Sequence, residues 1–430
     1  MASQQPAASR LSGVRRSLTP GRVLGAVLMG TLLLKVLLVL LHGTYYDYQS
    51  DDRGYLESAR VLLETGRFTY NDPSKPTVFI TPAYPGFLAS LMLLTGPGEL
   101  HEQTVRIVQA ILVTVSLYLL YRLGRRLVGE RAALWGTVLA AFYPPLWLMS
   151  NMLFTESLFL LMVLLLLGAA FRAEDRPTAG SAVLFGLLWA AAVYVRPTIA
   201  LWPGLFFLLL LVRRRIPWRR LAACGAIASL LFVLCLSPWW VRNYQVSGGD
   251  FIPLTKSSGN PLLLGTFPWT VPALFMEEQK TWHPTDDLWV NDELDTQMAK
   301  ERIAEGFREH FFLYLSWYTV GKFLLFWGDV FYWMKLPGVP LPVAVLYHYV
   351  LLALGAAGLW RRRRESGTVA VLTLLGYMSL LHMVYLAHSR YSVPLLPLLA
   401  LYAGAELLRR KQQRNRKKQQ GEEQAASLDA

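Results

Sequence analysis

The chain has 430 residues, of which 54% are apolar and 17% are charged, and its formal net charge is +13. A soluble chain would carry roughly 25% charged residues and a disordered one far fewer apolar residues, so both classes are excluded. Apolar runs of about 20 residues recur from end to end, each long enough to cross a bilayer. The sequence therefore predicts an all-α, polytopic membrane protein.

Ten spanning helices are predicted, at 23–42, 103–121, 131–149, 154–172, 180–195, 197–212, 219–240, 340–360, 368–386 and 392–408. Two further apolar stretches, 82–95 and 311–327, are flanked by segments that must lie on one side of the membrane. We expect these two stretches to form interfacial or re-entrant helices rather than crossings.

The basic residues of the chain gather beside the apolar runs, in clusters at 15–22, 122–131, 213–220, 361–364 and 409–418. Short loops rich in Lys and Arg mark the cytoplasmic side of a membrane. This placement explains the positive charge without a nucleic-acid partner and predicts that both termini are cytoplasmic, in a plasma-membrane protein.

With that orientation, the chain divides into five parts. A cytoplasmic tail (1–22) precedes a transmembrane catalytic module (23–240), which includes a first outward loop (43–102). A second large outward loop (241–339) contains the interfacial helix. The C-terminal helices (340–408) and a basic, polar cytoplasmic tail (409–430) follow, and we expect residues 411–430 to be disordered.

The first outward loop begins with two adjacent carboxylates. Ser50 is a suitable N-cap and Gly66 a suitable stop for an amphipathic helix that starts at Asp51. Such a helix lies along the membrane surface and holds Asp51 and Asp52 near the lipid headgroups. They are candidate catalytic residues; alternatively, acids in a first turn only complement the helix dipole.

Glu156 is a third candidate catalytic acid, at the outer mouth of an otherwise apolar hairpin. An ionisable residue in a span is costly and usually faces an aqueous cavity or a partner. The alternative is placement at the membrane interface, where the cost is small.

Three arginines are predicted on the outer side, against the positive-inside trend, and each lies beside aromatic residues or a proline. They could be interface anchors. Converging guanidinium groups would instead suit a phosphate, which they bind in forked geometry. The candidate residues for binding donor phosphate and substrate are Arg196, Arg242, Arg390, Tyr391 and Tyr55.

The sequence lacks a Walker loop, a GxGxxG after a strand, an HExxH and any Cys/His metal spacing. The candidate acids face away from the cytosol, where ATP and nucleotide sugars reside. An outward-facing enzyme therefore needs a donor energised in another way, such as a lipid-linked phosphate.

Several motifs resemble the C-type (GT-C) glycosyltransferases, in the bacterial branch related to dolichyl-phosphate-mannose protein mannosyltransferases and lipid A aminoarabinose transferases. The motifs are SDDRGY at 50–55, LLETGRF at 62–68, TPAYPGF at 81–87, YP at 143–144, TESLF at 155–159, SPWWVRNY at 237–244 and RYSVP at 390–394. The resemblance spans about 23–400.

The resemblance implies seven shared spanning helices followed by a variable C-terminal set. It also implies transfer of a sugar from a polyprenyl-phosphate donor to a glycan, lipid or protein acceptor on the extracytoplasmic face. By position, Asp51 matches the family's catalytic acid and Asp52 the flanking acid, which is usually Glu. No cofactor is required by the motifs, although a divalent cation at Asp51 and Asp52 stays open. The zinc-ligand acid of the aminoarabinose transferases has no counterpart.

These residues suit an inverting displacement. Asp51 would deprotonate the acceptor hydroxyl, and Arg242 and Arg390 would stabilise the leaving phosphate. Glu156 would assist the base or position the acceptor. The aromatic stretch 323–333 is a candidate wall for the prenyl tail. Two alternatives stay open: a transporter or flippase of lipid-linked sugars, with Glu156 as a proton or substrate site, and a non-catalytic membrane scaffold.

Overall fold

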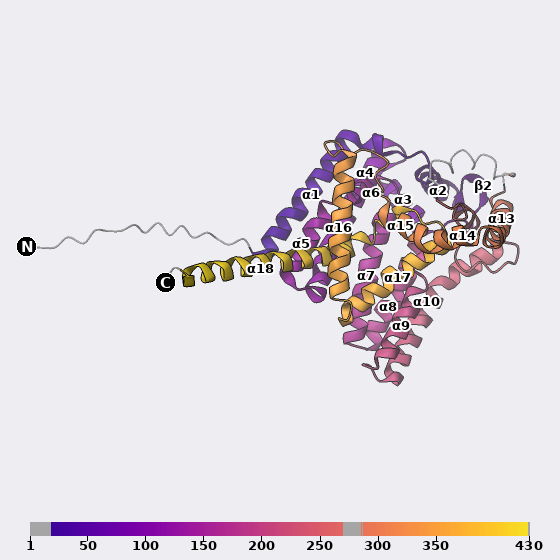
Figure 1. Cartoon of the computed structure of the whole chain (residues 1–430). Helices are drawn as coiled ribbons and strands as arrows, with labels where there is room; N and C mark the ends of the chain where they lie inside the picture. Colours follow the sequence, from indigo (N-terminus) through magenta and orange to yellow (C-terminus); the bar gives the residue numbers. More distant parts are fainter. Residues whose placement is uncertain (1–18, 270–284, 286, 429–430) are drawn as a thin grey trace, which may run out of the picture.

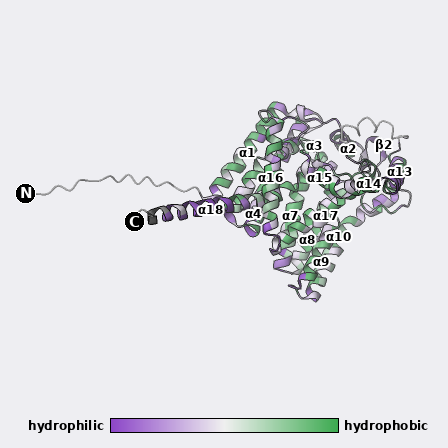
Figure 2. Cartoon of the chain, in the orientation of Figure 1, coloured by the Kyte–Doolittle hydropathy of each residue, from purple (hydrophilic) through white to green (hydrophobic). Residues whose placement is uncertain are grey.

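The computed structural model describes residues 19–269, 285 and 287–428. Most of the predicted N-terminal tail and part of the second outward loop, 270–284 and 286, lie outside the described residues. Long helices form a bundle, short elements gather on one side of it, and the last helix projects away from the other side (Figure 1). Apolar residues concentrate on the bundle helices, and polar residues on the far part of the last helix (Figure 2).

The first half of the chain supplies the bundle helices before the second outward loop. They are α1 (Pro20–His42), α4 (Glu99–Leu127), α5 (Glu130–Ala141), α6 (Pro144–Asn151), α7 (Glu156–Asp175), α8 (Ala179–Val195), the 3-10 turn η2 (Pro197–Ile199), α9 (Trp202–Arg213) and α10 (Trp218–Val246).

Among the described residues, seven helices are long and apolar enough to cross a membrane, and counting the bent pair α5–α6 as one span makes eight. The chain is thus a multi-pass membrane protein. A helix lies at the position of each predicted span, but the number ten is not confirmed, because α8 has 17 residues and α9 only 12.

The span predicted at 131–149 is broken into two helices. Helices α5 and α6 meet at an angle of 56°. Tyr143, the residue before Pro144, has the extended backbone that a following proline favours. The proline is then well placed in the first turn of α6, where its missing N–H is not needed. The bend redirects the chain so that it reaches Glu156 after only four further residues.

The first outward loop folds into η1 (Gly43–Tyr46), α2 (Asp51–Thr65), a hairpin of β1 (Thr69–Tyr70) and β2 (Asp72–Pro76), and α3 (Ala83–Thr95). Gly66 ends α2 as expected, with a left-handed φ of 70° and its N–H bonded to the Leu62 carbonyl. The Ser50 side chain, predicted as the N-cap, makes no capping bond. Gly54 lets the hairpin approach α2, because a Cβ there would lie 2.5 Å from the Tyr70 ring.

The second half of the chain covers this loop and completes the bundle. Its elements are α11 (Gly259–Leu264), α13 (Leu288–Glu309), α14 (Phe311–Ser316), the π-helical turn η4 (Trp317–Gly321), α15 (Lys322–Gly328), α16 (Leu341–Arg361), α17 (Ser366–Val384), the 3-10 turn η5 (Ser389–Tyr391) and α18 (Leu396–Leu428).

Helix α18 runs through the middle of the bundle and then beyond it. Gly136 of α5 and Gly404 of α18 pack so closely that a Cβ on either would lie within 2.6 Å of backbone atoms of the other helix. Small residues at such crossings are typical of membrane helices. The prediction that 411–430 is disordered is wrong for 411–428, which continue α18. The reason is that Lys, Arg, Gln, Glu and Ala all favour extension of a helix that has already formed.

Candidate active site

Glu156 is the buried centre of a group of charged side chains. It is the first residue of α7 and its side chain is fully buried. Its Oε1 accepts hydrogen bonds from Nη1 of Arg196 at 2.9 Å and from Nε of Arg390 at 2.5 Å. The N-terminal end of a helix also favours a carboxylate. A fully buried side chain with two cationic partners is not an interface residue facing water.

Asp51 joins the same group from the first outward loop. Its Oδ2 accepts a hydrogen bond from Nη1 of Arg390 at 2.8 Å. The Asp51 side chain is 41% exposed, whereas Arg390 is 13% exposed. Arg390 therefore bridges two carboxylates that are 105 residues apart in sequence (156 − 51), one buried and one open to solvent.

Aromatic rings surround the two arginines. The Arg390 guanidinium lies 3.8 Å from the ring centre of Phe154. The Arg196 guanidinium lies 4.7 Å from the ring of Tyr391. Cations stacked on aromatic faces keep their fork of N–H donors available at the ring edge. Thus Tyr391, a predicted site residue, is present as a support for Arg196.

A cavity of about 510 Å³ opens beside this group. Three predicted site residues, Tyr55, Arg196 and Tyr391, line it together with apolar residues of the first loop, η2 and the C-terminal end of α17. The aromatic stretch 323–333 does not line this cavity. Its Phe326 instead stacks on His382, which does line it, at 4.8 Å between ring centres.

Helix α4 fixes the backbone that leads to Glu156. Nε of Arg106 donates to the Asn151 carbonyl at 3.0 Å, and Nε2 of Gln109 donates to the Met152 carbonyl at 2.7 Å. Both side chains are fully buried. These bonds satisfy carbonyls that the break between α6 and α7 leaves without helical partners.

Asp52, predicted as a flanking catalytic acid, binds backbone rather than the charged group. Its Oδ1 accepts from the N–H of Ser50 at 2.7 Å and of Arg53 at 3.1 Å, and its Oδ2 accepts from the N–H of Tyr48 at 2.6 Å. The residue is 1% exposed. Asp52 thus shapes the turn before α2 and does the capping that we expected from Ser50.

Arg242, predicted as a phosphate ligand, also lies outside the group. It donates to the carbonyls of Thr77 and Phe68, the latter at 3.2 Å, and stacks on Trp239 at 4.9 Å. These contacts attach α10 to the two ends of the hairpin. They do not support the prediction that Arg242 holds a phosphate.

The acids offer few ligands to a divalent cation. In the parts of the chain that the structure describes, no three His, Cys, Asp or Glu side chains form a group able to hold a metal ion. Asp52 is saturated by backbone N–H groups and Asp51 pairs with Arg390. Since Ca²⁺ and Mg²⁺ take about six or more oxygen ligands, Asp51 and Asp52 alone are a poor fit.

Three titratable residues beside the group stay neutral. Burial and the Asp51 carboxylate raise the pKa of Tyr70 and of Tyr55 well above the usual value. Burial and the nearby Arg390 lower the pKa of His388 to about 3. Its unprotonated Nδ1 accepts the backbone N–H of Arg390 at 3.0 Å and so caps η5.

Sequence reasoning missed Tyr70, Phe154 and His388. Tyr70 lies close enough to Asp51 for the carboxylate to raise its pKa, which neither residue's neighbours in sequence indicate. Phe154 lies two residues before Glu156 and His388 two residues before Arg390. An aromatic residue close to a candidate charge could have been noticed, but its stacking geometry could not.

Comparison with known proteins adds two findings. Residues 76–241 match the family model of the dolichyl-phosphate-mannose-protein mannosyltransferases. No curated protein sequence matches the chain significantly.

Among solved structures, the chain is similar to the oligosaccharyltransferase AglB of Archaeoglobus fulgidus in complex with an inhibitory peptide and a dolichol-phosphate. The identity is 14% and the TM-score 0.51, over 88% of this chain and 50% of that one. For the same enzyme in complex with Zn and sulfate, the identity is 15% and the TM-score 0.54, over 89% of this chain and 48% of that one. For ArnT of Cupriavidus metallidurans bound to undecaprenyl phosphate, the identity is 17% and the TM-score 0.41, over 86% of this chain and 77% of that one.

The chain spans about half the length of the archaeal oligosaccharyltransferase. At these identities the likeness to that enzyme shows a shared fold. Residues 76–241 thus resemble the dolichyl-phosphate-mannose-protein mannosyltransferases, and the chain as a whole shares the fold of the archaeal oligosaccharyltransferase.

Proposed function

We propose that this protein transfers a sugar from a polyprenyl-phosphate donor to a hydroxyl acceptor on the extracytoplasmic face of the plasma membrane. One observation carries the proposal: a fully buried Glu156 holds Arg196 and Arg390 beside a cavity, and Arg390 in turn reaches a partly exposed Asp51. The arrangement puts an anion site and a candidate base next to one another. Transfer from a phosphate leaving group needs both.

Arg196 is the first candidate ligand of the donor phosphate. It lines the cavity, and of its guanidinium nitrogens only Nη1 donates a hydrogen bond to a described residue. Nη2 of Arg390 makes no hydrogen bond to a described residue either, so both guanidinium groups have donors left for phosphate oxygens. Arg196 replaces Arg242 in the mechanism that we expected from the sequence.

Asp51 is the candidate general base. In the proposed step, the acceptor O–H proton moves to the Asp51 carboxylate while the acceptor oxygen attacks the anomeric carbon. The bond from that carbon to the phosphate oxygen breaks, and the polyprenyl phosphate leaves with the electron pair. One displacement of this kind inverts the anomeric centre. The neutral Tyr70 lies beside this carboxylate.

Glu156 has a positioning role in this scheme. Its buried Oε1 is shared by two arginines, and its Oε2 lies 3.4 Å from Oγ1 of Thr155. It fixes the direction of both guanidinium groups before the donor arrives, which removes the cost of organising them during the reaction. A carboxylate bound in this way is a poor proton acceptor.

The cavity has the composition expected for a prenyl-phosphate headgroup and the start of its tail. Besides Arg196, its lining is largely apolar and aromatic, including Leu381, Leu386 and Tyr385 of the α17 end. The shared fold with an oligosaccharyltransferase described in complex with a dolichol-phosphate supports a ligand of this class.

The test is transfer by the purified protein in proteoliposomes. The probes are undecaprenyl-phosphate mannose and undecaprenyl-phosphate arabinose, each labelled in the sugar, with envelope extract from a deletion strain as the acceptor source. We expect label in the extract and equimolar undecaprenyl phosphate. Movement of intact donor across the bilayer without cleavage would support the flippase instead. No cleavage and no movement with either probe, although the protein is folded, would refute the transferase for these sugars.

A further inference from the structure

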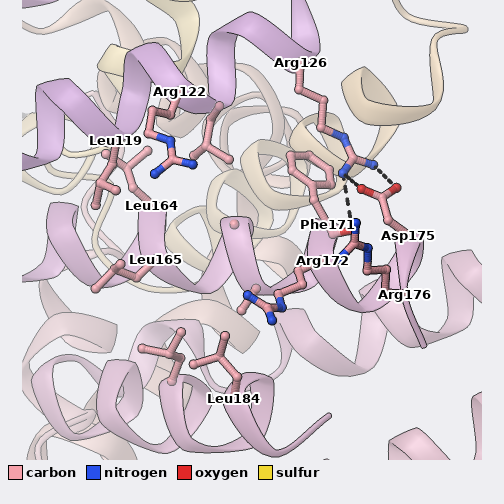
Figure 3. Close-up of a pocket in the computed structure, with 14 residues that line it drawn as sticks. Leu119, Arg122, Arg126, Leu164, Leu165, Phe171, Arg172, Asp175, Arg176 and Leu184 are labelled. Carbon is pink, nitrogen blue, oxygen red and sulfur yellow. Dashed lines mark hydrogen bonds and ion pairs between the residues drawn. The ribbon is translucent and has the colours of Figure 1, made fainter. Parts of the chain in front are cut away.

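A second cavity lies at the other end of the bundle from the candidate active site. Its volume is about 710 Å³. The C-terminal ends of α4 and α7 and the first half of α8 enclose it (Figure 3). Its lining includes the leucines 119, 123, 164, 165, 184 and 188. We call this space the basic groove.

The basic groove and Glu156 lie at opposite ends of α7. Glu156 is the first residue of this 20-residue helix and Asp175 its last, and Asp175 lines the groove. At 1.5 Å per residue the two ends are about 30 Å apart, which is the thickness of the hydrocarbon core. The groove therefore opens at the membrane face opposite the candidate active site.

The groove carries unpaired positive charge. Arg126 is neutralised, since its Nη2 lies 2.9 Å from Oδ1 of Asp175. Arg122, Arg172 and Arg176 form no side-chain hydrogen bond or ion pair with any residue that the structure describes. In Figure 3, Arg122 extends from α4 towards α7, and Arg172 extends from α7 towards the helix that carries Leu184. The three side chains are exposed, so together they form a positively charged surface that attracts an anion.

The walls of the groove are apolar, and this narrows the kind of anion. Leu119 and Leu123 of α4 face Leu164 of α7 and Leu184 of α8, and Gly168 leaves room between them. A soluble phosphate would contact the arginines but not the leucines, and an apolar peptide would contact the leucines but leave the arginines without an anion. A phospholipid matches both features, because its phosphate and its acyl chain are joined. Basic pockets between membrane helices are known to bind such headgroups.

We propose that the basic groove binds an anionic phospholipid of the adjacent leaflet. Arg122, Arg172 and Arg176 hold its phosphate, and one acyl chain lies along the leucines towards Gly168. This site is independent of the proposed sugar transfer, because none of its residues belongs to the candidate active site.

The test is native mass spectrometry of the purified full-length protein with phosphatidylglycerol, phosphatidylcholine or sodium phosphate as the probe. The variant Arg122→Gln/Arg172→Gln removes two groove charges. Its matched control, Arg125→Gln/Arg131→Gln, removes two exposed charges at the same end of the bundle that do not line the groove. Gly168→Leu fills the groove without a charge change, and a Cβ there meets nothing closer than 3.8 Å. Thermal unfolding checks that every variant is folded.

We expect phosphatidylglycerol to bind in a one-to-one ratio and more tightly than phosphatidylcholine. Each lost arginine should weaken it roughly 5-fold, so the groove variant should bind about 25-fold more weakly and the control nearly as the wild type. Gly168→Leu should also weaken it. Three results would overturn the proposal: equal loss in groove and control variants, binding unaffected by Gly168→Leu, or competition by sodium phosphate at concentrations comparable to the lipid.

Discussion

Asp51 and Glu156 are both carboxylates of one charged group, and the structure predicts that their amide variants fail in different ways. Asp51 is 41% exposed and contacts only one arginine, which keeps its bond to Glu156 when Asp51 is changed. Pairs of this exposure contribute about 0–1 kcal/mol to stability. Asp51→Asn should therefore leave the free energy of unfolding almost unchanged.

Loss of a general base typically slows a reaction about 10²- to 10⁴-fold, which corresponds to roughly 3–5 kcal/mol in the barrier. For Asp51→Asn, the rise in the barrier should thus be several times larger than the loss of stability. Glu156→Gln should show the opposite balance. It leaves two arginines without their buried partner, and breaking such a pair costs about 3–5 kcal/mol of stability.

The assay pairs thermal unfolding in detergent with single-turnover transfer from the donor probes, measured on the folded fraction. Asp72→Asn is the control, since this acid lies in the same loop, is 37% exposed and contacts only local partners. It should match the wild type in both measurements. An Asp51→Asn variant that keeps more than about a tenth of the wild-type rate would refute the assignment of the base.

Three further predictions concern the surroundings of the group. Arg196→Lys should lower the rate of transfer by about 10- to 100-fold, because Lys cannot supply the forked donors. Arg242→Lys should mainly lower the unfolding temperature. Equal losses of transfer in both variants would contradict the assignment of phosphate binding to Arg196 and of a structural role to Arg242. The pKa of His388 is lowered to about 3 in the folded protein, whereas its value in the unfolded chain is near 6.5. Between these two pH values the unfolded chain binds one more proton than the folded protein. Stability therefore falls as the pH falls, by at most about 1.4 kcal/mol per pH unit. His388→Asn keeps an acceptor for the N–H of Arg390 but does not titrate, so its unfolding temperature should fall less steeply between pH 6.5 and 4; parallel curves would exclude His388 as the cause. Gly54→Ala should cost about 1–3 kcal/mol of stability, because its Cβ would press on the Tyr70 ring beside Asp51. Gly86→Ala is the control, since a Cβ there meets nothing within 4 Å. The unfolding temperature should fall for the first variant only, and an equal fall in both would contradict this reasoning.

The parts of the fold that follow from local patterns could be predicted from the sequence. A run of apolar residues determines where a membrane helix can lie, and helices occupy all ten predicted positions. The helix Asp51–Thr65 and the position of Glu156 near the start of a span could also be predicted, because the terminating Gly66 and the placement of charge are local signals.

The pairing of the charged residues could not be predicted in the same way. Arg390 lies 234 residues after Glu156 in the chain. It reaches that acid only because α18, which follows it, packs into the centre of the bundle. Asp52 and Arg242 look like functional residues in the sequence, since charge and position were the only available criteria. Their partners are backbone groups, and because every residue has these groups, the sequence does not indicate which of them a side chain will bind.

In the absence of donor, the charged group is neutral within itself: Asp51 and Glu156 balance Arg196 and Arg390. The candidate base is then occupied by the same arginine that the phosphate requires. In the proposed function, an arriving phosphate would share Arg390 with Asp51 and weaken its hold on the carboxylate, which leaves the carboxylate freer for an acceptor hydroxyl. Under the proposed function, this pairing predicts an order of addition, with the lipid-linked sugar first and the acceptor second. Such an order would also limit hydrolysis of the donor, because the candidate base would stay paired with Arg390 until a donor is bound.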